Sequence, residues 1–364
     1  MSSTMPGSTD SWVTISLPDM FKGFLVAEPA VNPFYNDARA KSEMWLQSAM
    51  TLSPKQAKRV QYCNFTYFVS VLIPHAPKER LKIASDWGNW IFVFDDSKLK
   101  GRTPQPAGGT PSNTAFVLIV FDEGELRDDP DTSQRIVHNL LSIMVPEVQR
   151  TSEEPVVMAH DSFYQELAQY ISPAATTSFG QAALLTDVSL AGVLRRYVEA
   201  MKSYSTGCLQ HVVDFTADQT PTLLEMLETR RISSGVFPMY PLIEFAYDLN
   251  LPDEVFLDPT VQKLSNLGVE LVMLMNDILS YPKEELTPLR QSEDCPFSTV
   301  AVCRMNGASA QQAFDEIASM VDARFSAWDE AAEALPSWGA EVDAQLHQYI
   351  QGIQNIVQAN ISWR

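Results

Sequence analysis

Apolar residues recur every three or four positions along most of the chain after residue 36, which predicts helices. The segments with this spacing are 56–73, 79–95, 133–149, 156–171, 188–215, 222–232, 236–249, 261–284, 297–304, 309–335 and 338–361. Alternating patterns typical of strands are rare, and no repeat of fixed period is present. Residues 1–35 contain four breakers, Pro6, Pro18, Pro29 and Pro33, and predict an irregular segment. No linker divides the rest, so we predict an all-α protein with a single helical domain over 36–364.

Residues 98–120 do not fit this pattern. The segment KLKGRTPQPAGGTPSNTAFVLIV holds three Pro, three Gly, three basic residues and no acidic residue. It begins as a breaker-rich loop and ends as a short apolar run. It also interrupts a predicted helix where that helix reaches its polar end.

The formal net charge is −19, from 45 acidic and 26 basic residues. A surface this acidic repels nucleic acid and anionic membranes, so neither is expected as a partner. The same charge is compatible with carboxylates that bind divalent cations. The four cysteines show no metal-ligand spacing, residues 1–20 lack the apolar core of a signal peptide, and no apolar run approaches the roughly 18 residues that span a bilayer. We expect a cytoplasmic protein, and the sequence leaves the oligomeric state open.

Two adjacent acids close an aromatic stretch. The run Trp87–Phe94 is rich in aromatic residues and is followed directly by Asp95 and Asp96. A carboxylate next to a buried helix is costly unless charge compensates it, and a divalent cation is one such charge. A solvated helix end is the alternative interpretation, and this pair alone does not decide between them.

A second set of oxygen ligands follows the apolar run Leu271–Met275. Asn276, Ser280 and Glu284 are spaced four apart, and such residues differ by only about 40° around a helix axis. Amide, hydroxyl and carboxylate oxygens are hard ligands suited to Mg²⁺ beside phosphate. The alternative is a chance N-x-x-x-S-x-x-x-E spacing on a polar helix face. Because the three residues directly follow an apolar run, the pattern favours a magnesium-binding face that points inward. Pro282 predicts that this helix bends or ends there, since proline removes one helical hydrogen bond.

These residues resemble the metal-binding motifs of class I terpene synthases, particularly the fungal, basidiomycete-like sesquiterpene synthases. Asn276-Asp277-x-x-Ser280-x-x-x-Glu284 is similar to the NSE motif of that family, and Asp95-Asp96 stands where the family has its aspartate-rich motif. The family also has a diphosphate-sensing arginine 46 positions before the Asn, and that position here is Arg230. Arginine suits the task because its planar fork binds phosphate in bidentate fashion. The resemblance covers roughly residues 36–363.

The resemblance implies the all-α class I terpene synthase (isoprenoid synthase) barrel and a Mg²⁺-dependent cyclase acting on farnesyl diphosphate. It implies three Mg²⁺ ions held by Asp95, Asp96, Asp122, Asn276, Ser280 and Glu284. Arg230 and Lys283 would bind the diphosphate, with Ser233 and Ser234 at the positions that help trigger ionisation. An apolar cavity would then guide the carbocation, with aromatic faces offering cation–π contacts. Candidate wall residues are Trp87, Trp90, Phe92, Phe65, Phe237 and Tyr240, each of which is otherwise explained by core packing.

The chain departs from the family in its aspartate motif. Asp95-Asp96-Ser97-Lys98-Leu99 places leucine where D-D-x-x-D has an acid. Deleting Lys98–Val120 closes the sequence to Asp95-Asp96-Ser97-Phe121-Asp122, which restores the motif. Our hypothesis is that residues 98–120 translate a retained intron or a faulty gene model, and sequencing the transcript tests it. Alternatively, the insert is genuine and Phe116–Phe121 followed by Asp122 forms a second acidic helix end.

The C-terminus departs as well. Family members usually carry an Arg-Tyr pair beyond a tryptophan, whereas this sequence ends at Trp363-Arg364. Both departures concern diphosphate or metal handling, so an alternative is a catalytically impaired or non-catalytic member of the same fold. Use of another prenyl diphosphate is a further alternative, and a purely structural helical protein is the remaining one. No motif specifies the terpene product.

Overall fold

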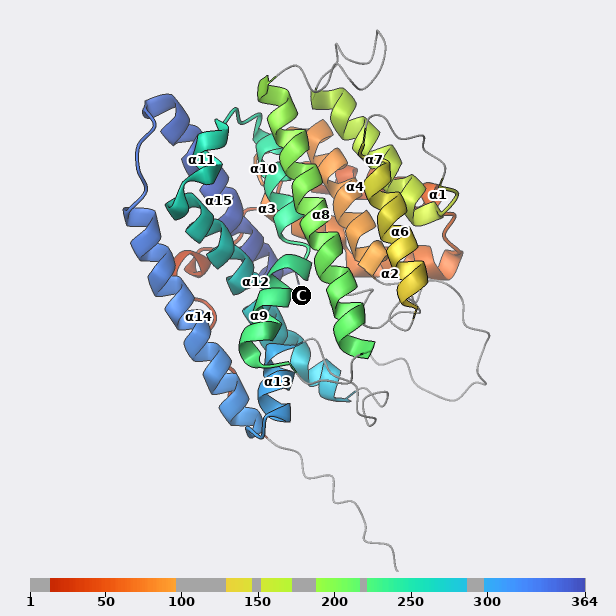
Figure 1. The fold of residues 1–364 in the computed structure, drawn as a ribbon. Coiled ribbons are helices and arrows are strands. Elements are labelled where there is room, and N and C mark those ends of the chain that lie inside the picture. The colour runs from red at the N-terminus through yellow and green to blue at the C-terminus, as the bar shows by residue number, and fades with distance from the viewer. Residues whose placement is uncertain are drawn as a thin grey trace, which may run out of the picture.

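The computed structural model describes residues 14–95, 129–145, 152–171, 188–216, 221–286 and 298–363. All regular structure in these ranges is helical, which confirms the predicted all-α class (Figure 1). The α-helices are α1 Tyr35–Ala49, α2 Pro54–Cys63, α3 Phe65–Leu72, α4 Lys78–Asp95, α6 Pro130–Ser142, α7 Pro155–Ile171, α8 Val188–Thr216, α9 Leu223–Ser233, α10 Tyr240–Tyr247, α11 Asp253–Leu257, α12 Pro259–Leu286, α13 Thr299–Met305, α14 Ala310–Glu333 and α15 Ala340–Ser362. Two 3-10 helices, η1 Gly23–Val26 and η5 Phe237–Met239, complete the set within these ranges.

Two of the predicted helices are each split in the structure. The segment 56–73 forms α2 and α3, which meet at Asn64 in the left-handed conformation with φ 53°. Asparagine tolerates this conformation better than most residues, and it ends one helix while starting the next. The segment 236–249 forms η5 followed by α10, with Pro241 in the first turn of α10. Helix α1 was not among the predicted segments.

Helix α12 continues past Pro282. The prediction allowed a bend or an end at this proline, and the alternative that the helix ends there is wrong, because α12 runs to Leu286. Proline removes one backbone donor, which a long helix tolerates when tertiary packing holds both sides. The backbone of Lys283 and Glu284 therefore belongs to α12.

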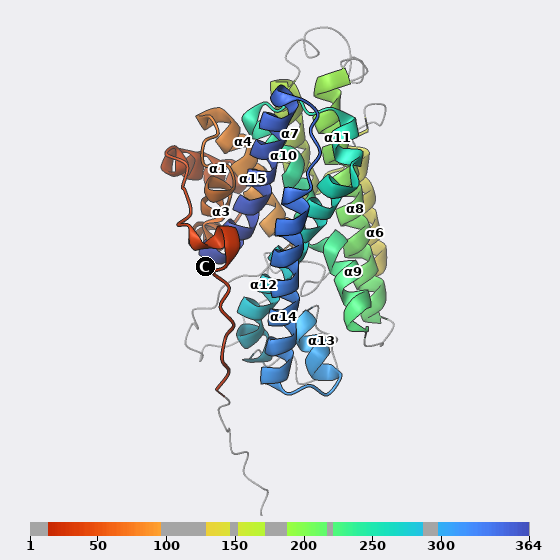
Figure 2. The same cartoon turned by 90° about the vertical axis from the view of Figure 1, so that its left-hand side faces the viewer.

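The core is built around close contacts of α12 and α15. Helix α12 packs against α9, α13, α14 and α15, while α4 packs against α1, α3 and α7 (Figures 1 and 2). Gly268 of α12 allows a close approach, since a Cβ there would lie 2.3 Å from Ile353 Cγ2 of α15. None of the helices in the described ranges combines the length and apolarity needed to cross a bilayer.

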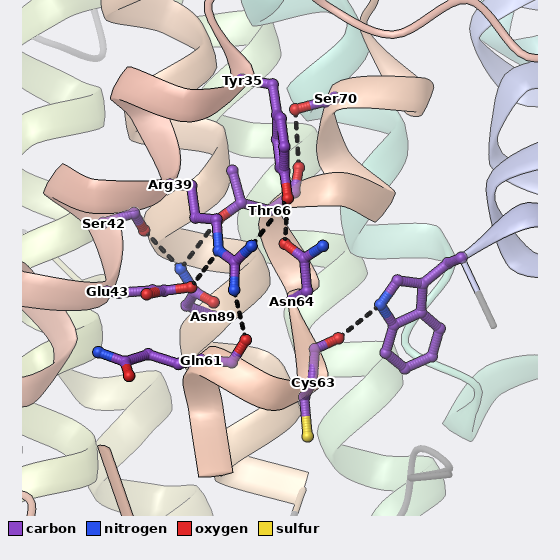
Figure 3. Close-up of polar contacts among 11 residues, drawn as sticks. Tyr35, Arg39, Ser42, Glu43, Gln61, Cys63, Asn64, Thr66, Ser70 and Asn89 are labelled. Atoms are coloured by element: carbon purple, nitrogen blue, oxygen red, sulfur yellow. Dashed lines mark hydrogen bonds and ion pairs between the residues drawn. The ribbon is translucent and has the colours of Figure 1, made fainter. Parts of the chain in front are cut away.

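A polar network fixes the start of α3 against α1 and α4. Tyr35 Oη donates to Asn64 Oδ1 at 2.8 Å, and Asn89 Nδ2 donates to Ser42 Oγ at 2.7 Å and to Thr66 Oγ1 at 3.3 Å (Figure 3). Ser42, Thr66 and Asn89 are all fully buried. Buried polar groups that are hydrogen-bonded in this way specify one arrangement of the helices around them. This network lies next to Phe65 in α3 and one turn before Phe92 in α4.

Candidate active site

The polar stripe of α12 faces the protein interior. Asn276 is 3% exposed and Ser280 is 2% exposed, directly after the buried run Leu271–Met275. Asn276 Nδ2 donates to Asn360 Oδ1 at 3.3 Å, whereas Asn276 Oδ1 has no hydrogen-bond partner among the described residues. A buried carbonyl oxygen without a partner carries a desolvation penalty that a bound ligand can remove.

The unpartnered Asn276 Oδ1 is available as a ligand for Mg²⁺. An amide oxygen is a hard ligand, and Ser280 places a second oxygen one helical turn away on the same buried face. The donor set is therefore of the kind that Mg²⁺ takes. In the part of the chain that the structure describes, no three His, Cys, Asp or Glu side chains cluster as a metal site. The side chains of the predicted carboxylate ligands, Asp95, Asp96, Asp122 and Glu284, all lie outside that part.

The remaining predicted metal ligands fall at or beyond the limits of the described residues. Asp95 is the last residue of α4, and Glu284 lies in the last turn of α12, but the side chains of both are outside the described set. The side chain of Lys283 is outside it as well. Asp96, Asp122 and the whole segment 98–120 are not described. The structure describes the backbone of the two helix ends, α4 at Asp95 and α12 at Glu284.

Arg230 is buried and paired, and is not a surface arginine. It is 4% exposed, and its Nη2 donates to Asp277 Oδ1 at 2.6 Å. The neighbouring Arg231 makes a parallel contact two turns earlier on α12, where Nη2 lies 2.6 Å from Glu270 Oε1. Glu270 Oε2 also accepts from Arg324 Nε of α14 at 2.8 Å. The two arginines thus fix the last turn of α9 along α12, and Arg230 pairs with Asp277, the residue that follows Asn276 in the chain.

Asp277 connects three helices. Its Oδ1 accepts from Arg230 of α9, while its Oδ2 accepts from the backbone N–H of Thr299 at 2.8 Å and from Thr299 Oγ1 at 2.9 Å. Thr299 is the first residue of α13, so Asp277 satisfies one of the backbone donors that a helix start leaves open. A carboxylate at a helix N-terminus is also favoured by the helix dipole. No role was predicted for Asp277 from the sequence, because its partners Arg230 and Thr299 are distant from it in the chain.

Ser233 and Ser234 lie directly beyond Arg230 at the end of α9. Ser233 is the last helical residue, and Ser234 Oγ donates to Arg231 O at 3.5 Å. Gly235 follows with φ +70°, a left-handed conformation that terminates helices and favours glycine. Helix α8 approaches closely here, since a Cβ on Gly207 would lie 2.8 Å from the backbone nitrogen of Ser233.

The rings of Phe65, Phe92 and Trp363 form an aromatic cluster. The rings of Phe65 and Phe92 lie face to face, with centroids 4.0 Å apart and planes 5° apart. The Trp363 ring lies 5.5 Å from Phe65 and 5.2 Å from Phe92, and its Nε1 donates to Cys63 O at 2.7 Å. Phe65 and Phe92 were predicted as wall residues. Trp363 was not, because the sequence indicated only its place near the terminus.

Two of the other predicted wall residues have packing roles. Trp90 donates through Nε1 to Val156 O at 2.8 Å, and its ring lies tilted against that of His160 with centroids 4.5 Å apart, so it packs α4 against α7. Tyr240 donates through its hydroxyl to Ser265 O at 2.8 Å, which joins α10 to α12. Trp87 is buried in the core, and Phe237 packs edge-on against Tyr240 at 5.8 Å. For Trp90 and Tyr240 the contacts favour the packing interpretation.

Buried His160 makes the stability of the folded protein depend on pH. It is completely buried, its Nε2 lies 2.7 Å from Tyr197 Oη, and burial lowers its pKa to about 3. The unfolded chain binds a proton near pH 6.5 while the folded chain does not, so stability falls as pH falls below 6.5. We expect the free energy of unfolding to drop by about 2 kcal/mol more between pH 7 and pH 5 in the original protein than in His160→Gln.

Urea titrations at the two pH values measure this difference, and His347→Gln is the matched control because His347 is exposed on α15. Burial raises the pKa of Asp86 and of Glu244 to about 7, so both carboxyls favour the folded state as pH falls through 7. Both are present in every variant and cancel in the comparison. Equal pH slopes for the original protein and His160→Gln would contradict the assignment.

Comparisons with known proteins give a consistent result. A family model described as "Terpene synthase family 2, C-terminal metal binding" matches residues 119–327, which is more than half of the chain. A silphinene synthase of Penicillium patulum is 28% identical over 355 residues, covering 96% of this chain and 84% of that protein. A (+)-eremophilene synthase of Gibberella fujikuroi is 25% identical and covers 96% of this chain and 86% of that protein.

Solved structures show the same fold. The crystal structure of the reconstructed ancestral protein SVS_A2 superposes with a TM-score of 0.70 at 20% identity, covering 92% of this chain and 87% of that one. Cucumene synthase superposes with a TM-score of 0.66 at 16% identity, covering 93% and 97% respectively. At these identities the likeness establishes the architecture, and the barrel implied by the sequence motifs is confirmed.

Proposed function

This chain belongs to the terpene synthase family, as a class I enzyme, and from that premise we propose that it is a Mg²⁺-dependent cyclase which ionises farnesyl diphosphate and cyclises the carbocation to a sesquiterpene. The sesquiterpene synthases among its relatives support the substrate. The observation that carries the proposal is the buried, unpartnered Asn276 Oδ1, with Ser280 on the same face of α12. Arg230 pairs with Asp277, the next residue of the same helix.

We propose that Asp95, Asp96, Asp122, Asn276, Ser280 and Glu284 hold the metal, with three Mg²⁺ ions at full occupancy. When bound, Mg²⁺ neutralises the charge that develops on the departing diphosphate. Asn276 and Ser280 contribute neutral oxygens from a face that excludes water, which strengthens their interaction with any charge placed there. The expected carboxylates from α4 and from the last turn of α12 would balance the positive charge.

Arg230 is proposed to bind the diphosphate, with Lys283 as a second cation and Ser233 and Ser234 as hydroxyl and backbone donors beyond it. Arg230 donates to Asp277 in the described structure, so the diphosphate would share or replace that contact. A guanidinium held at 4% exposure is already desolvated, and an anion reaching it meets little competition from water. Arg230 stands at the end of α9 and pairs with Asp277 of α12. If diphosphate replaced Asp277 as its partner, the packing of α9 against α12 would change as well.

Phe65, Phe92 and Trp363 are proposed to line the cavity for the carbocation. Their rings present π faces and no nucleophilic atom, and the Trp363 N–H is already donated to Cys63 O. Such a surface stabilises positive charge by cation–π contact and keeps water away from the cation. The stack stands on α3 and α4, and α4 ends at Asp95, so metal site and apolar wall share one helix.

Residues 98–120 are proposed to be absent from the working enzyme. The family model begins its match at residue 119, where this segment ends, and its matched region includes Asp122. Without the segment, Asp95, Asp96 and Asp122 fall within one D-D-x-x-D motif. The alternative, in which the insert is genuine and the chain is catalytically impaired, makes an opposite prediction in the assay below.

The test is a product assay with farnesyl diphosphate and Mg²⁺, with extracted volatiles analysed by gas chromatography and mass spectrometry. The full chain is run beside a version lacking Lys98–Val120, and geranylgeranyl diphosphate is offered in parallel. We expect a sesquiterpene from the shortened version at a rate well above that of the full chain. Hydrocarbon from geranylgeranyl diphosphate alone would overturn the substrate assignment. Absence of product from both versions, each shown to be folded, would favour a non-catalytic member of the family.

A further inference from the structure

We propose that Asn360 is a positioning residue for the metal site: it fixes the amide of Asn276 so that the carbonyl oxygen, and not the NH₂ group, faces the site. This inference rests on the proposed function, since it concerns how that site is prepared. Asn360 lies near the end of α15, 84 residues beyond Asn276, and is 1% exposed. Neither the family model, which ends at residue 327, nor the sequence motifs include it.

The hydrogen bonds set the direction of both amides. Asn360 Nδ2 donates to the backbone carbonyl of Val272 at 3.2 Å, and a carbonyl oxygen can only accept. The NH₂ group of Asn360 must therefore point at the carbonyl of Val272. This leaves Asn360 Oδ1 as the acceptor that faces Asn276. Asn276 Nδ2 lies 3.3 Å from that oxygen and donates to it. The orientation of Asn276 thus follows from a backbone carbonyl whose role cannot be reversed.

The consequence for Asn276 is an oxygen left over. With Nδ2 engaged, Oδ1 points away from Asn360 and has no partner within the described residues. The opposite amide orientation would bring two oxygens together at 3.3 Å and would present an NH₂ group to a cation. Both effects oppose metal binding, so Asn360 makes one of two otherwise similar orientations the stable one.

The end of α15 is fixed well enough to perform this task. Trp363, three residues beyond Asn360, donates through Nε1 to Cys63 O at 2.7 Å and packs on Phe65 and Phe92. The same turn of α15 therefore contacts both the aromatic rings of Phe65 and Phe92 and helix α12. Groups that orient a ligand in this way typically affect metal affinity by 10- to 100-fold when removed.

The experiment measures binding of inorganic pyrophosphate at a fixed Mg²⁺ concentration by isothermal titration calorimetry, which does not depend on turnover. We expect Asn360→Leu, similar in size but without the amide, to weaken binding by about tenfold. The matched control is Asn355→Leu on the same helix, because Asn355 is also buried and donates to a backbone carbonyl, Leu72 O, at 3.1 Å. The control is expected to lose comparable stability and to keep its affinity within about twofold.

Repeating the measurement in an Asn276→Asp variant distinguishes a role of Asn360 in orienting residue 276 from a role in packing. In Asn276→Asp the carboxylate presents an oxygen whichever way it turns, so it needs no neighbour to orient it. We expect Asn360→Leu to cost less than about twofold in affinity there, against about tenfold in the original protein. Equal losses in both backgrounds would overturn the proposal and assign Asn360 a packing role. Should the leucine variants not fold, Asn360→Ser and Asn355→Ser make the same comparison.

Failure of this inference is distinguishable from failure of the proposed function. If neither the full chain nor the version lacking Lys98–Val120 shows Mg²⁺-dependent binding of pyrophosphate, the metal site itself is wrong. If the original protein binds and Asn360→Leu binds equally well, the site stands and the positioning role of Asn360 is wrong.

Discussion

Asn276→Ala is expected to lower the rate of product formation from farnesyl diphosphate by about a hundredfold or more, while the protein stays folded. The substitution removes the buried, unpartnered oxygen on which the proposed metal-ligand role of Asn276 rests. A metal ion supplies several kcal/mol of stabilisation to the departing group, and each 1.36 kcal/mol is worth tenfold in rate. The rate is measured as hydrocarbon formed per enzyme under saturating substrate and Mg²⁺, with the substitution made in the version lacking Lys98–Val120 and compared with that version unsubstituted.

The matched control is Asn266→Ala on the exposed side of the same helix, which is expected to keep full activity. Asn276→Ala also leaves Asn360 Oδ1 without its donor, which costs about 1 kcal/mol of stability. That loss is small enough that circular dichroism at the assay temperature should be unchanged. A folded Asn276→Ala protein that retained even a tenth of the activity would contradict the ligand assignment.

The helices were largely predictable because their signal is local. Apolar spacing placed α7, α8 and α12 within two residues of their observed ends. The error at 56–73 has a local cause that periodicity does not register, because a single asparagine at φ 53° breaks the helix without interrupting the apolar pattern. At Pro282 the sequence allowed a bend or an end, and the structure excludes only the end, because α12 runs on to Leu286.

The site was predictable only as far as residue spacing reaches. The Asn276–Ser280 spacing indicated a shared face, and the structure buries both side chains. The partners that give these residues their properties come from distant elements: Asp277 pairs with Arg230, and Asn360 orients Asn276 across 84 positions. Sequence patterns carry no record of such pairings unless a motif already includes them. Arg230 was found by family spacing alone, since nothing local distinguishes a buried arginine from an exposed one.

Asp277→Ala is expected to lower the free energy of unfolding by about 3–5 kcal/mol, the largest stability effect predicted for this protein. The Arg230 side chain is 5% exposed and that of Asp277 is 1% exposed, so solvent screens their interaction little. Removing one partner of a buried ion pair leaves the other charge desolvated without compensation. The same substitution removes the acceptor for Thr299 at the start of α13. Urea denaturation followed by circular dichroism measures the change.

The comparison variant is Asp322→Ala, which breaks an ion pair with Lys22 whose side chains are 55% and 38% exposed, and should cost below about 1 kcal/mol. Adding Arg230→Met to Asp277→Ala should recover part of the lost stability, because it removes the stranded charge. If Asp277→Ala cost no more than Asp322→Ala, Asp277 would not be what holds α9 and α13 on α12. Arg230 would then be kept in place by its other contacts, and a diphosphate could draw it away from Asp277 without loosening that end of the bundle.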